Sequence, residues 1–168
     1  MLGKVSFVVL FLGGAISRGF AERMYSYVMR VLRRFRAYFH QIYAKAVRYV
    51  VTGKVSLIFS EVRENSVLLL IIIGDYRHVV LVSFDKSRGF VSAYCSCPDF
   101  IFNVGRRSGR RFCAHIIAVF ICLESFLSSI FGRSDSVYKC SLELRSTPSI
   151  VEVLSKCADR LLIGNPDG

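Results

Sequence analysis

Three cysteines and one histidine in the middle of the chain have the spacing of metal ligands. They lie in the segment YCSCPDFIFNVGRRSGRRFCAHIIAVF as Cys95-x-Cys97, a basic spacer, and then Cys113-x-His115. Residues two apart on a strand point to the same face, so Cys95 and Cys97 can direct both sulfurs to one point. Thiolate and imidazole are the ligands that Zn²⁺ takes in a closed tetrahedral site. The spacing predicts a structural zinc site, with four unrelated buried core residues as the alternative.

Positioning these ligands requires a strand end at the first pair and a helix start at the second. Pro98 follows the first pair directly and should end the strand and turn the chain. The apolar run 114–126 predicts a helix, which places Cys113 at its cap and His115 in its first turn. Three thiolates, one imidazole and Zn²⁺ carry a net charge of about −1. The free N–H groups and the dipole of a helix N-terminus favour that charge.

The rest of the central region predicts one helix and four short strands. Apolar residues from Val28 to Tyr49 recur at alternating steps of four and three, which indicates an amphipathic helix ending near Thr52 and Gly53. Its apolar stripe is expected to pack on the core, with a seam for a partner helix as the alternative. Short β-branched runs separated by turn residues predict strands and hairpins. The expected strands are Val55–Val62, Val67–Ile73, Tyr76–Phe84 and Gly89–Cys95.

The chain divides into three regions around this core, and the expected fold class is α+β. Residues 1–23 form an apolar segment, interpreted as an extra strand, a leader or the product of a start codon called upstream of Met24. Residues 24–131 carry the N-terminal amphipathic helix, the small antiparallel sheet, the zinc site and the following helix. Residues 132–168 form a tail with a packing helix. The apolar run 5–12 is too short for a membrane span of about 20 residues, so a membrane partner is not expected.

The positive charge is gathered in two blocks. The formal net charge of the 168 residues is +11, and eight basic residues lie between Glu22 and Glu61 without any acid. Four more, Arg106, Arg107, Arg110 and Arg111, lie in the spacer between the ligand pairs. Such blocks favour a polyanionic partner, and solvated faces are the plainer alternative. The predicted nucleic-acid contacts are the four spacer arginines with Arg30, Arg33 and Arg34; charge compensation for the zinc thiolates is the alternative for the spacer.

The ligand pattern and its flanks resemble a known family. Cys-x-Cys, a spacer and Cys-x-His form the signature of the SWIM zinc finger. The flanks Tyr94 to Pro98, Phe100-x-Phe102 and the run Ile-Ile-Ala-Val after His115 resemble the small SWIM proteins of the Shu-complex type. That resemblance covers about residues 94 to 120. It implies a partner, a RecA-fold recombinase paralog, and a role in homologous recombination and DNA repair on single-stranded DNA.

Two classes of function stay open from the sequence. The first is a non-enzymatic accessory subunit, in the cytoplasm of a prokaryote or the nucleus of a eukaryote. The second is a free-standing DNA-binding module of transcriptional or transposon-associated type. Enzyme activity is not expected, because a four-ligand zinc leaves no position for water. A Cys113–His115 nucleophilic pair is the enzymatic alternative, but it would need an orienting acid and a pocket.

Overall fold

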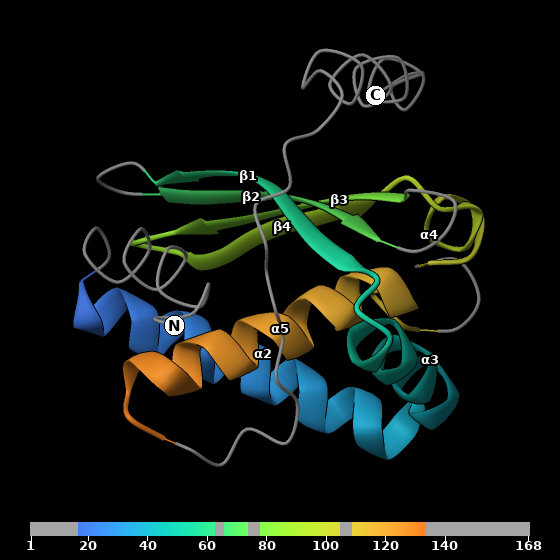
Figure 1. Ribbon diagram of the computed structural model, residues 1–168, viewed down its shortest axis with the longest axis horizontal. Coiled ribbons are helices and arrows are strands. Elements are labelled where there is room, and N and C mark those ends of the chain that lie inside the picture. Colours follow the sequence, from blue (N-terminus) through green and yellow to red (C-terminus); the bar gives the residue numbers. More distant parts are fainter. Residues whose placement is uncertain (1–16, 63–65, 74–77, 105–108, 134–168) are drawn as a thin grey trace, which may run out of the picture.

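The fold consists of an antiparallel sheet and a layer of helices on one of its faces. The computed structural model describes residues 17–62, 66–73, 78–104 and 109–133. The sheet has four strands in the order β1-β2-β3-β4, and helices α2, α3 and α5 lie together beneath it, with α4 at the end of β4 (Figure 1). The predicted α+β class is therefore confirmed.

The four strands follow one another along the chain and pair with their sequence neighbours. They are β1 Val55–Val62, β2 Ser66–Ile73, β3 His78–Asp85 and β4 Gly89–Cys95, all antiparallel. The sequence predicted these strands to within two residues at each end. In β3 the buried residues Val80, Val82 and Phe84 alternate with less buried ones, because one face of the strand packs on the helices.

The predicted long helix is wrong in one respect, because it is two helices. Helix α2 runs Arg18–Tyr38 and α3 runs His40–Val51, and between them Phe39 has φ −131° and ψ 47°, outside the helical region. Each half keeps its apolar period, so the stripe continued across the break. Helix α2 also begins earlier than Met24, since Ser17 accepts a hydrogen bond from the N–H of Phe20 as its N-cap.

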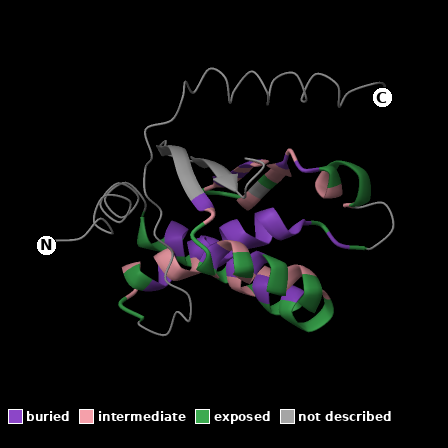
Figure 2. Ribbon diagram, turned by 45° about the vertical axis from the view of Figure 1, so that its right-hand side comes forward, coloured by how far each residue is buried: buried purple, intermediate pink, exposed green. Residues whose placement is uncertain are grey.

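Helix α5 is the centre of the core. It runs Ala114–Ile130 and is buried on nearly every side from Ala114 to Leu123. The reason is its position, because it packs against α2 and α3 on one side and β3 and β4 on the other. A helix that is apolar all round belongs in such a place. Figure 2 shows this contrast, with α5 mostly buried and the outer faces of the other helices exposed.

A group of five aromatic rings joins the elements around α5. Edge contacts with ring centroids 5.3 to 6.5 Å apart connect these rings. The rings belong to Tyr27 of α2, Phe84 of β3, Phe90 of β4, Phe112 in the stretch before α5, and Phe120 of α5. Tyr27 and Phe90 are instead stacked, at 4.5 Å and 6°. Each such pair contributes about 0.5–1.5 kcal/mol beyond its buried area. The cluster thus fixes α2 and the β3–β4 hairpin against α5.

Two expectations fall partly or wholly outside the described residues. The packing helix expected in 132–168 lies beyond Arg133, and residues 1–16 of the apolar N-terminal segment are likewise not described. Residues 18–23, grouped with that segment above, are part of α2, where Phe20 and Ala21 are buried in the core. Of the helices within the described ranges, none has the length and apolarity that crossing a bilayer would take.

Candidate metal centre

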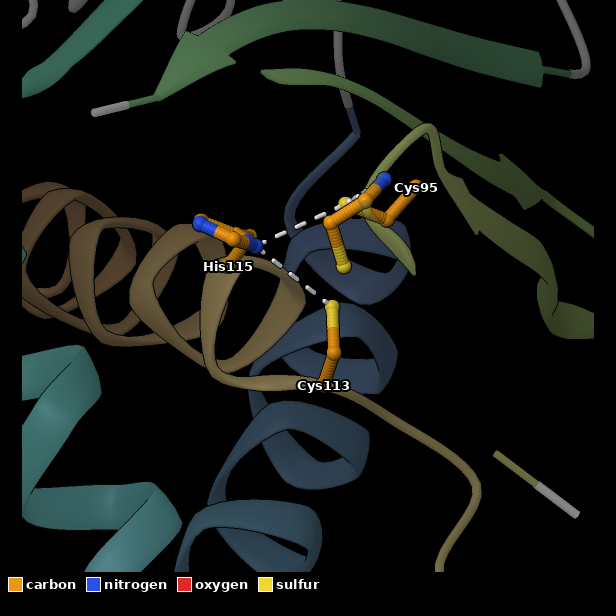
Figure 3. A group of neighbouring side chains, drawn as sticks. Cys95, Cys113 and His115 are labelled. Carbon is orange, nitrogen blue, oxygen red and sulfur yellow. Dashed lines mark hydrogen bonds between the residues drawn. The ribbon is translucent and has the colours of Figure 1, made fainter. Parts of the chain in front are cut away.

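The four predicted ligands meet at one point, between the end of β4 and the start of α5. Cys95 is the last residue of β4, Cys97 is the N-cap of α4 Pro98–Asn103, and Cys113 is the N-cap of α5. His115 lies in the first turn of α5. All four side chains are buried, and their ligand atoms lie within 4.8 Å of one another. Figure 3 shows Cys95, Cys113 and His115 pointing toward a common centre.

The distances fit a tetrahedral zinc site. The Nδ1 atom of His115 lies 3.8 Å from the sulfur of Cys95 and 4.0 Å from that of Cys113. A tetrahedron with Zn–S bonds of about 2.3 Å has edges of roughly 3.8 Å between its ligand atoms. The site therefore needs little adjustment to accept the ion. Three sulfurs and one nitrogen are also the donor set that zinc prefers over harder cations.

Backbone N–H groups are directed at the sulfurs, as a negatively charged site requires. The N–H of Cys97 lies 3.5 Å from the sulfur of Cys95, and the N–H of Phe100 lies 3.3 Å from that of Cys97. The second contact is an N-cap bond in which a cysteine takes the place usually filled by serine or aspartate. These donors stabilise thiolate over thiol.

The three thiols cannot all ionise together without a metal. Hydrogen bonds from Cys113 and Cys95 hold the pKa of Cys97 far below its usual value. The pKa of Cys95 is raised, first by its hydrogen bonds to Cys113 and Cys97 and then by burial. Burial raises the pKa of Cys113 to about 12. We infer that the metal-free cluster holds one thiolate and two thiols, and that zinc displaces the two remaining protons.

Neighbouring side chains hold His115 in place. Its ring stacks on Tyr49 of α3, with centroids 4.9 Å apart, and lies 4.6 Å from the ring of His78 at the start of β3. Ser96, between the first two ligands, bonds to the opposite strand, because its Oγ accepts from the N–H of Val79 at 2.9 Å. The ligands are therefore mounted on elements that are themselves fixed. Cys122, farther along α5, takes no part in the cluster and is disulfide-bonded.

The spacer arginines differ in what the structure shows of them. Arg106 and Arg107 lie outside the described residues. Arg110 is buried, and its guanidinium forms an ion pair with Asp99 of α4. It is therefore not presented to a ligand, in contrast to the expectation that it contacts nucleic acid. Arg111 is exposed.

The arginines of α2 lie at the surface, and the short helix α4 is an element that the sequence did not predict. Arg30, Arg33 and Arg34 are all exposed on α2, as a nucleic-acid contact would require. Helix α4 was not expected, because Pro98 was interpreted only as a strand stop. Proline at the first helical position was the available signal, since its missing N–H costs nothing there.

We expect the purified chain to hold one zinc ion, and replacement of a ligand to remove it. Cys97→Ala should lose most of the metal and destabilise the fold, because structural zinc binding is coupled to folding. Ser96→Ala is the matched control: it removes the hydrogen bond from the N–H of Val79, worth about 0.5–1.5 kcal/mol, and should keep its zinc. Metal analysis of both variants is the measurement. Full zinc occupancy in Cys97→Ala would exclude Cys97 as a ligand.

Zinc affinity should fall as the solution is acidified. Since Cys95 and Cys113 have raised pKa values, zinc must expel their protons, and a higher proton concentration opposes binding. With two protons released, log affinity should rise by about two for each pH unit in the neutral range. Competition with a chromophoric chelator at several pH values measures the slope. A slope of zero would mean that the thiols are already ionised.

A comparison with protein families agrees with this geometry. Residues 78–124 match the family model of the SWIM zinc finger. The matched segment begins at β3 and ends in α5, so it contains all four ligands and the elements that carry them. Comparison with curated proteins and with solved structures gave no match. The match and the cluster together support zinc as the bound ion.

Proposed function

We propose that this chain is a non-enzymatic, zinc-binding accessory protein that contacts single-stranded DNA and binds a RecA-fold recombinase paralog in homologous recombination and DNA repair. The observation that carries the proposal is the closed Cys95, Cys97, Cys113 and His115 cluster within a SWIM zinc finger match, beside a surface rich in exposed arginine. A SWIM zinc finger of this kind is suited to act as a rigid scaffold that contacts DNA or another protein.

The ligand set supports a structural role for the metal. Four protein ligands fill a tetrahedral ion and leave no coordination position for a substrate or an activated water. Cys113 and His115, the residues of the enzymatic alternative, are both used by this site, and both are buried. The only acid close to the spacer among the described residues, Asp99, is paired with Arg110. This acid is therefore already engaged and is not placed to orient a nucleophilic pair.

Exposed arginines support contact with DNA. Arg30, Arg33, Arg34 and Arg111 are exposed, and within the described ranges none of them is paired with a carboxylate. Guanidinium groups match phosphate oxygens in pairs of hydrogen bonds. The loop that carries Arg111 is held by zinc ligands at both ends, so ordering it on a phosphate chain costs less entropy.

Replacing Arg106, Arg107 and Arg111 of the spacer should weaken DNA binding and reduce its salt dependence. If Arg106, Arg107 and Arg111 each neutralise one phosphate of a single strand, the Gln triple variant should lower the slope of log affinity against log salt by about 2. The loss should be alike for different base sequences, because phosphate contacts do not read bases. Titration of a labelled oligonucleotide at several salt concentrations measures this. An unchanged slope would assign the spacer to charge compensation.

An exposed apolar surface supports a protein partner. The flank Phe100-x-Phe102 lies on α4, where Phe100 packs on Tyr94 with ring centroids 5.6 Å apart. Phe102 is instead 62% exposed, and Ile101 beside it is 37% exposed. An exposed phenylalanine on a helix braced by the zinc site and the Arg110–Asp99 pair is suited to anchor a partner. We place the contact with the recombinase paralog there.

The partner should be lost when Phe102 is made polar. Phe102→Ser removes the anchor, and anchor residues of this kind cost more than about 1 kcal/mol when truncated. Tyr38→Ser is the matched control, since Tyr38 is 77% exposed near the end of α2. Co-purification from native extract with mass spectrometry compares the two. If the unmodified chain brings down no RecA-fold protein, the accessory role fails and the free-standing DNA-binding module takes its place.

A further inference from the structure

A basic groove lies on the side of the molecule where α2 meets the β3–β4 turn. It is an open, shallow depression of about 470 Å³ lined by residues of both elements, including Arg23, Arg30 and Arg88. Figure 1 shows the beginning of α2 below this end of the hairpin. None of these residues belongs to the metal centre, and two of the three arginines were not among the contacts expected from the sequence.

The turn that carries Arg88 is rigidly built. One carboxylate oxygen of Asp85 accepts hydrogen bonds from the N–H groups of Ser87 and Arg88, at 2.9 and 3.0 Å, and Gly89 follows with φ 76°. Arg23 then fastens the turn to α2, since its Nη2 donates to the carbonyl oxygen of Lys86 at 2.7 Å. The two walls of the groove are thus held at a fixed separation.

The charge in the groove is mainly positive. Arg30 and Arg88 are exposed, and no carboxylate in the part of the chain that the structure describes pairs with either. One carboxylate, Glu22, also lines the groove, and it pairs with Arg18 at 3.2 Å. Asp85 accepts hydrogen bonds within its turn and interacts electrostatically with Arg88. Arg34 follows Arg30 by four residues, so it lies on the same side of α2. A row of guanidinium groups therefore extends along the helix from the groove.

The floor of the groove explains what kind of contact it can make. Tyr27 and Phe90 line it, and they are stacked on each other at 4.5 Å, so the face that each ring turns to the other is already in use. Burial raises the pKa of Tyr27 despite the opposing effect of Arg111 and Arg30, so its hydroxyl stays protonated and can donate to an anion.

Phe112, which follows Arg111 in the zinc spacer, packs edge-on against Phe90 of the groove with ring centroids 5.7 Å apart. Arg111 is therefore attached next to a residue that contacts the groove. A chain of phosphates bound in the groove can therefore extend toward Arg111. That continuity favours a polymer of phosphates over a single small anion.

We propose that the groove between α2 and the β3–β4 turn binds the phosphodiester backbone of single-stranded nucleic acid, with Arg30 and Arg88 as the phosphate contacts and Arg23 as the residue that positions the turn. The inference rests on the proposed function and adds a second contact to it. Recognition is independent of base sequence, because the contacts are charged donors directed at phosphates.

An anionic membrane is the less suitable partner. Membrane binding by a basic surface is strengthened by apolar side chains that enter the lipid boundary. The large exposed apolar residues of the described chain are Tyr38, Val51, Ile101 and Phe102, and none of them lines the groove. The groove is concave, and the hydrogen bond from Arg23 to Lys86 joins its two walls. Its shape therefore suits a narrow polyanion such as a single nucleic-acid strand better than a flat lipid surface.

The test compares two full-length, zinc-loaded double variants that lose equal charge. Arg30→Gln with Arg88→Gln removes the groove contacts, whereas Lys45→Gln with Arg48→Gln removes two exposed charges from α3. On a labelled oligothymidylate, the groove variant should lower the slope of log affinity against log salt by about 1.4, at roughly 0.7 per phosphate. The α3 variant should leave the slope unchanged. Arg30→Lys with Arg88→Lys should restore most of it.

Each outcome decides one question. If both Gln variants reduce the slope equally, binding follows net charge and the groove is not a site. If the unmodified chain binds the oligonucleotide and the groove variant behaves like it, the groove inference alone fails. If the unmodified chain does not bind the oligonucleotide at all, the proposed function fails with it. Vesicles containing phosphatidylserine are the second probe, and loss of vesicle binding in the groove variant without any binding to DNA would assign the groove to membranes.

Discussion

The zinc site ties the last strand of the sheet to the first turn of the central helix, and most of the fold depends on that tie. Cys95 ends β4 and Cys113 is the N-cap of α5, and the described residues between them include the short helix α4. Held at both ends, this segment loses much of the conformational entropy that a free loop would keep. Helix α5 packs against α2, α3, β3 and β4, so fixing its start relative to the sheet also fixes the core.

The local pattern was sufficient for the strands and the ligands. Three signals act within a few residues of the ligands. They are the two-residue spacing of the first cysteines on a strand, the proline after the second cysteine and the apolar run after the third. The spans of β1 and β4 agree with the sequence prediction at both ends, and Cys113 is the N-cap of α5 as expected. Features of this kind are set by neighbouring residues, so a sequence without a structure is enough to find them.

Features that depend on tertiary contacts were not predictable in this way. The break at Phe39 leaves the apolar period intact on both sides, so only the packing of α3 on α5 reveals it. The cap of α4 is a cysteine sulfur, a residue type that helix-start rules do not include. Arg23 and Lys86 meet across 63 residues of sequence, so the groove had no local signal. The ion pair of Arg110 had no local signal either, because its partner Asp99 is eleven residues away.

The metal centre and the basic surface are connected through the residues that precede α5. Along the chain from Arg110 to Phe112 the burial alternates: Arg110 is buried against Asp99, Arg111 is exposed, and Phe112 packs into the aromatic cluster. Cys113 follows directly and is fixed by its place in the zinc site. The register of this extended stretch is therefore set at its end by the metal, and a shift of one residue would exchange the two arginines. The position of Cys113 in the metal centre is thereby coupled to which guanidinium neutralises Asp99 and which one lies at the surface.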